Sequence, residues 1–179
     1  MGVLRNRVDG KATERLQAGY VSLHGTGKER MIVSYHYWTT NGFGFCVDDI
    51  HTTPKRLMEL AAMNEEVLRR VEEYLNEEHP GWTIESLNME DFNDLEGNYG
   101  ETGLAHVLYK VIFAELDVTV ASDFDNKYYI LYEPSYPWNM PKNEENLTSD
   151  DVFKVFWKYI SVVTDEYIFI DYRSVENGG

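Results

Sequence analysis

Residues 52–81 read "TTPKRLMELAAMNEEVLRRVEEYLNEEHPG" and form the most strongly helical segment of the chain. Apolar residues recur at the spacing of one helix face, which predicts an amphipathic segment. Thr53 followed by Pro54 is a typical helix start, because the hydroxyl can cap and proline fits the first helical position. Asn64 followed by two glutamates is a second start signal, so we expect two helices that meet there.

The elements expected around this unit predict an α+β fold. "TTNG" at 39–42 is a turn signal between strands. The expected strands are 19–25, 29–38, 43–47, 82–88, 117–122, 127–133 and 166–173, and the other expected helices are 102–116 and 148–163. This order predicts a single domain at 17–179, with a mostly antiparallel sheet and about four helices packed on one face. Residues 1–16 are polar and basic, and we expect an arm or a short helix there.

The charge of the chain is strongly acidic and unevenly distributed. The 179 residues carry a formal net charge of -15, although residues 1–30 alone carry +3. No Lys or Arg occurs between Arg70 and Lys110. That interval holds ten acidic residues: Glu72, Glu73, Glu77, Glu78, Glu85, Glu90, Asp91, Asp94, Glu96 and Glu101. Such a segment repels nucleic acids and anionic lipids and attracts basic protein surfaces, although a solvated face that keeps the protein soluble has the same composition.

Cysteine content and hydropathy predict a cytoplasmic protein. Cys46 is the single cysteine, so no intramolecular disulfide can form and a reducing compartment is expected. The opening "MGVLRNRVDG" lacks the apolar core of a signal peptide, and no run reaches the ~18 apolar residues of a membrane helix. We therefore expect neither a membrane nor a nucleic acid as a direct partner.

The sequence does not match the known patterns of a metal site, and it offers only a weak candidate for a catalytic nucleophile. The stretch "NMEDFNDLEGNYGET" (88–102) has Leu95 and Glu96 where a calcium loop starting at Asp91 needs a ligand and a glycine. The five histidines are scattered, without the close spacing of zinc ligands. A Cys46–His51 nucleophile pair is conceivable, but a strand cysteine followed by an ordinary loop histidine is far commoner. We expect no metal and no cofactor.

One enzymatic alternative rests on the hairpin predicted at 117–133. Asp117, Asp125 and Lys127 are arranged as D…D-x-K across two strands, which resembles the PD-(D/E)xK nuclease pattern. That resemblance implies two carboxylates on a divalent cation and a lysine that stabilises charge. Asn126 departs from the pattern, because an apolar residue is usual there, and the triplet stands at a turn.

The leading hypothesis is a non-catalytic inhibitor that binds a basic, nucleic-acid-handling protein through its acidic segment, which could mimic a phosphate array. The proline-rich "PSYPWNMP" (134–141) could add the aromatic anchors that binding hot spots favour. A homodimer is compatible with the high aromatic content. The predicted partner-binding residues are Glu72, Glu73, Glu77, Glu90, Asp91, Asp94, Glu96, Tyr136 and Trp138.

"GWTIESLNMEDFNDLEGN" (81–98) and "TDEYIFIDYRSVENGG" (164–179) give the chain a general likeness to accessory proteins of mobile elements. Together with its small size, acidity and low cysteine content, the chain resembles, as a class, the anti-CRISPR and antirestriction inhibitors of phages. That resemblance implies inhibition of a CRISPR nuclease in the bacterial cytoplasm and carries over no individual residue. The same acidic composition is also compatible with an immunity protein against a basic toxin, or with a plain regulatory domain.

Overall fold

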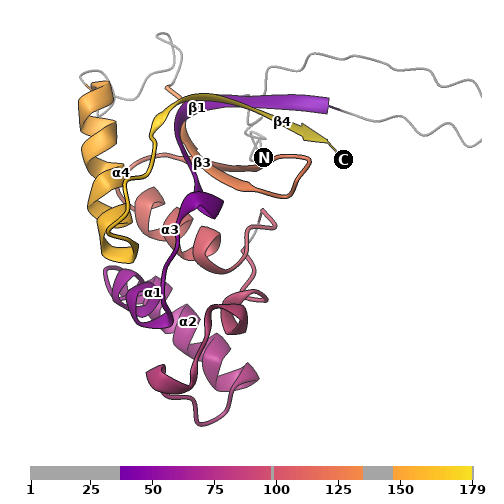
Figure 1. Cartoon of the computed structure of the whole chain (residues 1–179), viewed down its shortest axis with the longest axis vertical. Helices are drawn as coiled ribbons and strands as arrows, with labels where there is room; N and C mark the ends of the chain where they lie inside the picture. Colours follow the sequence, from indigo (N-terminus) through magenta and orange to yellow (C-terminus); the bar gives the residue numbers. More distant parts are fainter. Residues whose placement is uncertain (1–36, 98, 135–146, 179) are drawn as a thin grey trace, which may run out of the picture.

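The computed structural model describes residues 37–97, 99–134 and 147–178, and within them the predicted α+β class is confirmed (Figure 1). The strands form one antiparallel sheet in the order β2-β3-β1-β4. The strands are β1 (Tyr37–Cys46), β2 (Thr119–Ser122), β3 (Tyr128–Tyr132) and β4 (Asp171–Gly178). The helices are α1 (Pro54–Ala61), α2 (Glu65–Glu78), α3 (Gly103–Phe113) and α4 (Ser149–Val163), with short 3₁₀ helices η1 (Val47–Asp49), η2 (Ile84–Ser86) and η3 (Met89–Phe92).

The two helices expected to meet near residue 64 are confirmed as α1 and α2. Thr53 caps α1 by accepting the backbone N–H of Arg56, and Pro54 is its first residue. The side chain of Asn64 caps α2 by accepting the N–H groups of Glu66 and Val67. The helices expected at 102–116 and 148–163 are likewise found as α3 and α4.

The turn predicted at 39–42 is wrong, because β1 runs through it as one continuous strand. β1 pairs with β4 along 37–44 and with β3 along 43–46. Its glycines explain the misleading signal: a Cβ on Gly44 would overlap the carbonyl oxygen of Ile130, and one on Gly42 would lie 2.7 Å from the carbonyl oxygen of Tyr132. Glycine is needed here for close backbone approach inside a bent strand, and not for a turn.

One further strand prediction is wrong, and another is confirmed only in part. The segment 82–88 contains the 3₁₀ helix η2, because Thr83 and Ser86 exchange side-chain and backbone hydrogen bonds that compete with a ladder. The closing strand begins at Asp171 and not at 166. Ile168 and Ile170 are buried and alternate with the exposed Tyr167 and Phe169, but residues 166–170 do not form a strand. The strand expected at 19–25 lies outside the described residues.

The main core lies between one face of the sheet and the helices (Figure 1). Phe45 of β1 meets Phe156 of α4 edge to face, with ring centroids 5.3 Å apart, and both side chains are fully buried. The opposite face of the sheet carries a separate small cluster of Ala121, Leu131 and Val175. The helices α1 and α2 extend away from the sheet, so the segment after α2 forms the far end of the molecule (Figure 1).

Candidate functional site

The acidic residues of α2 lie on its outward face. Val67, Val71 and Leu75 are buried against the rest of the protein. Glu72, Glu73 and Glu77 are exposed, as the helical spacing predicts, and Glu73 accepts a hydrogen bond from Arg69 at 2.7 Å. Three of the predicted partner-binding residues therefore face solvent on one helix.

The acids of the following segment lie beside the flank of α2. The hydroxyl of Tyr74 on α2 donates to the backbone carbonyl of Asp91 at 3.1 Å, which ties the two segments together. Burial raises the pKa of Tyr74, and the negative charges of Asp94, Glu78 and Asp91 raise it further. Carboxylates from both segments therefore contribute to one negative field around this tyrosine.

The loop acids differ in what they do. Glu90, Asp94 and Glu96 are exposed. Asp91 is partly buried and accepts the backbone N–H of Asn88 at 2.8 Å, which closes the capping box of η3. Asp91 therefore has a structural role in addition to its charge, whereas the side chains of the neighbouring Glu90 and Asp94 are exposed to solvent.

Glu101 belongs to the segment without Lys or Arg, but it does not contribute to the charge at the protein surface, because its side chain is 0% exposed. An isolated β-bridge joins Glu96 to Thr102, and the N–H of Gly97 donates to the carbonyl of Glu101 at 2.8 Å. This closes the loop and turns the carboxylate inward. One oxygen accepts the backbone N–H of Tyr99 at 2.9 Å.

The other carboxylate oxygen of Glu101 meets His106 of α3. Nδ1 of His106 lies 3.3 Å from Oε1 of Glu101, and both side chains are buried. A carboxylate accepts hydrogen bonds, so Nδ1 carries the proton in this pair. Sequence reasoning missed this buried Glu–His pair, because a five-residue separation across a helix start is no recognised motif. Gly97, which packs onto both side chains, was the available signal.

The three residues of the nuclease alternative are not gathered at one point. Asp117 precedes β2, whereas Asp125 and Lys127 lie in the turn at its other end. In that turn Asp123 accepts the N–H groups of Asp125 and Lys127, at 2.9 and 3.0 Å. Across the described ranges, no group of three His, Cys, Asp or Glu side chains is placed to hold a metal ion.

The Cys46–His51 pair is not formed. His51 is exposed, and its Nδ1 lies 3.3 Å from Glu166. Cys46 is buried, and burial raises the pKa of its thiol, which disfavours the nucleophilic thiolate. Tyr136 and Trp138 lie outside the described residues. In the part of the chain that the structure describes, no helix has the length and apolar character needed to cross a bilayer.

A scan against protein-family models, a search of curated proteins and a search of solved structures each return no match.

Proposed function

We propose that the protein binds a basic protein surface through seven exposed carboxylates, here called the acidic surface. The target class that best fits these charges is a nucleic-acid-handling protein, such as a CRISPR nuclease, whose basic groove otherwise takes phosphates. Binding there would inhibit by occlusion. The acidic surface consists of Glu72, Glu73, Glu77, Glu78, Glu85, Glu90 and Asp94.

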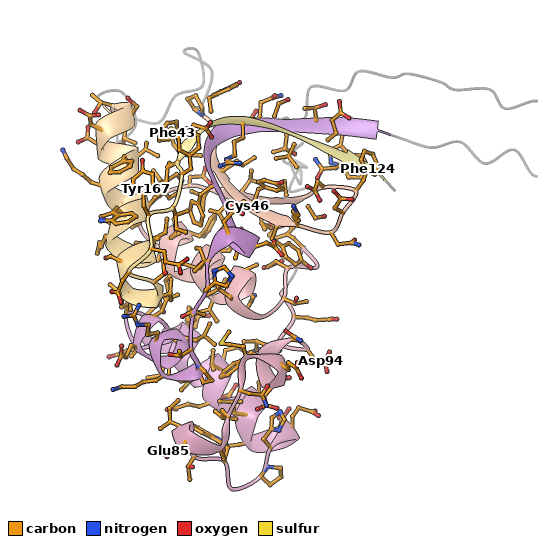
Figure 2. All side chains as sticks on the ribbon, viewed as in Figure 1. Phe43, Cys46, Glu85, Asp94, Phe124 and Tyr167 are labelled. Atoms are coloured by element: carbon orange, nitrogen blue, oxygen red, sulfur yellow. The ribbon has the colours of Figure 1, made fainter. Side chains whose placement is uncertain are left out.

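The observation that carries this proposal is that these exposed acids all lie on α2 and the segment after it, in the part of the molecule away from the sheet. Figure 2 shows Glu85 and Asp94 at this end, while Phe124 and Phe43 lie at the sheet end. No Lys or Arg occurs between Arg70 and Lys110, so few positive charges within this segment offset its carboxylates. A basic partner would meet little repulsion across this surface.

Charge would contribute mainly to the association rate and to partner choice. Electrostatic steering can raise association rates about 10–10³-fold at low salt, and this gain falls as the salt concentration rises. Apolar contacts must supply much of the remaining affinity. Tyr136 and Trp138 are kept as proposed anchors on the strength of their residue type.

The test is a capture experiment followed by a charge-matched comparison. The protein is used to capture partners from a bacterial lysate at low and high salt, and the captured protein is then purified. Its affinity is measured for wild type and for the variant Glu72→Gln, Glu77→Gln, Glu90→Gln, Asp94→Asn. Asp91 is left unchanged because it caps η3, and Glu73 because it pairs with Arg69.

The control removes four negative charges from exposed positions elsewhere: Asp49→Asn, Asp125→Asn, Asp150→Asn and Glu176→Gln. We expect the surface variant to lose at least tenfold in affinity and to show a flatter salt dependence, while the control stays near wild type. Equal losses in both variants would mean that only net charge matters, and the proposed surface would then be wrong.

A further inference from the structure

A cavity of about 510 Å³ lies between α2, α3 and the loop at 96–97. Arg70 and Glu66 line it from α2, and His106, Lys110 and Phe113 line it from α3. Lys110 follows His106 by one helical turn, so the two side chains share a face. The base-free segment thus begins and ends at the same place in space, because the cations that bound it, Arg70 and Lys110, line one cavity.

Among the described residues of this acidic protein, these two cations are unusual in having no carboxylate partner. Within the described ranges, every other Lys or Arg except Lys127 lies within 4.0 Å of a carboxylate oxygen. No such contact is found there for Arg70 or Lys110, although Lys110 also lies 5.4 Å from the ring centroid of Tyr109. Two of the three described cations without a carboxylate therefore line the same cavity.

His106 adds a proton-accepting atom to this cavity. Its Nδ1 is held by Glu101, and its Nε2 has no hydrogen-bond partner among the residues described. Burial lowers the pKa of His106; the hydrogen bond and negative charge of Glu101 oppose this, and the positive charges of Lys110 and Arg70 lower it further. The imidazole is therefore neutral at pH 7 and presents a lone pair at Nε2.

We propose that this cavity binds a small anion, a carboxylate or a phosphate monoester, through Arg70 and Lys110, and that His106 takes up a proton at Nε2 when the anion binds. The proton comes from solvent, and the imidazolium is then held between Glu101 and the anion. An anion beside the ring favours its charged form and offsets the two cations. Binding and proton uptake are therefore coupled.

The carboxylates around the cavity limit what it can take. Glu66 and Glu96 line it together with Arg69, and Arg69 is already paired with Glu73. These two carboxylates balance the charges of the two unpaired cations, so the cavity attracts no anion at long range and disfavours a polyanion such as nucleic acid. Only an anion small enough to contact Arg70 and Lys110 directly, away from Glu66 and Glu96, fits this arrangement. The ligand class is therefore a small metabolite-sized anion, which is a different partner from the basic protein proposed above.

The test follows the ring resonances of His106 by NMR during pH titrations of the full chain. Inorganic phosphate and acetate serve as separate probes, with ionic strength held constant by sodium chloride. We expect saturable shifts at His106 and a higher pKa for this histidine with bound anion. Saturation by phosphate alone would identify a phosphate site, and saturation by acetate alone a carboxylate site.

The variants Arg70→Gln and Lys110→Gln should each weaken anion binding about tenfold, because each removes one charge-assisted hydrogen bond. Lys127→Gln is the matched control, because Lys127 also lacks a carboxylate partner within the described residues but lies in the β2–β3 turn. An equal loss of anion binding in all three variants would overturn the proposal. So would the absence of a saturable change in the His106 resonances with either probe. Neither result depends on the acidic surface, so the two proposals fail independently.

Discussion

Gly97 is the residue that allows the Glu101–His106 pair to form. A Cβ at this position would overlap the carboxylate of Glu101 and Nδ1 of His106, and both neighbours are buried. We expect Gly97→Ala to lower the free energy of unfolding by about 1–3 kcal/mol, the usual cost of overpacking. Chemical denaturation measures this loss.

Gly100→Asn is the control for Gly97→Ala in the same loop. Gly100 has a φ of +78°, and a Cβ at this position would have no heavy atom within 4 Å. Asn tolerates this backbone conformation, so Gly100→Asn should leave the free energy of unfolding nearly unchanged. An equally large loss in Gly100→Asn would mean that the whole loop is intolerant and that packing at Gly97 is not the cause.

The protonation of His106 predicts a pH dependence of stability. Its pKa is lowered in the folded protein, chiefly by burial, so the unfolded chain takes up this proton first as the pH falls. The stabilisation is present above the unfolded pKa of about 6.5 and is lost as the pH falls from there through the folded pKa. We expect wild type to lose more stability than His106→Asn between pH 7.5 and 5.5.

Thermal unfolding of both proteins at matched ionic strength measures this difference. Asn can keep an N–H donor toward Glu101 but does not titrate. Comparing the slopes of the two proteins therefore isolates the contribution of His106, because all other groups are shared. Parallel pH profiles for the two proteins would contradict the prediction.

At the scale of elements, the cap at Asn64 separates α1 from α2. Asn64→Ala removes the acceptor for two backbone N–H groups and should lower the free energy of unfolding by about 1 kcal/mol. Asn64→Asp keeps an acceptor oxygen and should retain most of the stability. Urea denaturation of the three proteins checks both expectations, and equal losses in Ala and Asp would show that the cap is not the source.

Most helices could be predicted from sequence because their signals are local. Caps such as Thr53 and Asn64, and apolar stripes, act within one or two turns of the helix they define. The error at 82–88 has a local cause, the Thr83–Ser86 hydrogen bonds, whereas the errors in β1 and β4 occurred where a distant partner decides the structure. Gly42 indicates a turn until β3 and β4 are known to pair with β1, and the register of β4 depends on a strand more than a hundred residues earlier.

The candidate sites also contain some features that local sequence patterns predict and others that only tertiary packing determines. The outward placement of Glu72, Glu73 and Glu77 follows from helical periodicity and was predictable. The placement of Arg70 and Lys110 around one cavity and the burial of Glu101 depend on how α2, α3 and the loop pack. No local pattern gives such a juxtaposition, because the residues are brought together only by tertiary structure.

At the scale of the whole molecule, the acidic surface should cost stability. Like charges repel, and the chain carries a net charge of -15. The variant Glu72→Gln, Glu77→Gln, Glu90→Gln, Asp94→Asn should therefore unfold at a higher temperature than wild type in about 0.01 M salt, and the difference should shrink in about 1 M salt, where screening is nearly complete. Calorimetry at both salt concentrations measures this.

A variant that is less stable than wild type at low salt would contradict this expectation. It would mean that these carboxylates make favourable local interactions, and the acidic surface would then have a structural explanation. If the acidic surface serves recognition, the variant should be more stable than wild type and should bind the partner more weakly.

The pairing of β1 with β4 has a consequence for synthesis. Among the described residues, 37–42 have ladder partners only in residues 173–178, so this part of β1 stays unpaired until almost all of the intervening chain has left the ribosome. The helices, with local contacts, can form earlier. During translation the nascent chain therefore exposes an unpaired strand edge, which is the period in which it is most prone to associate with other chains and most dependent on chaperones.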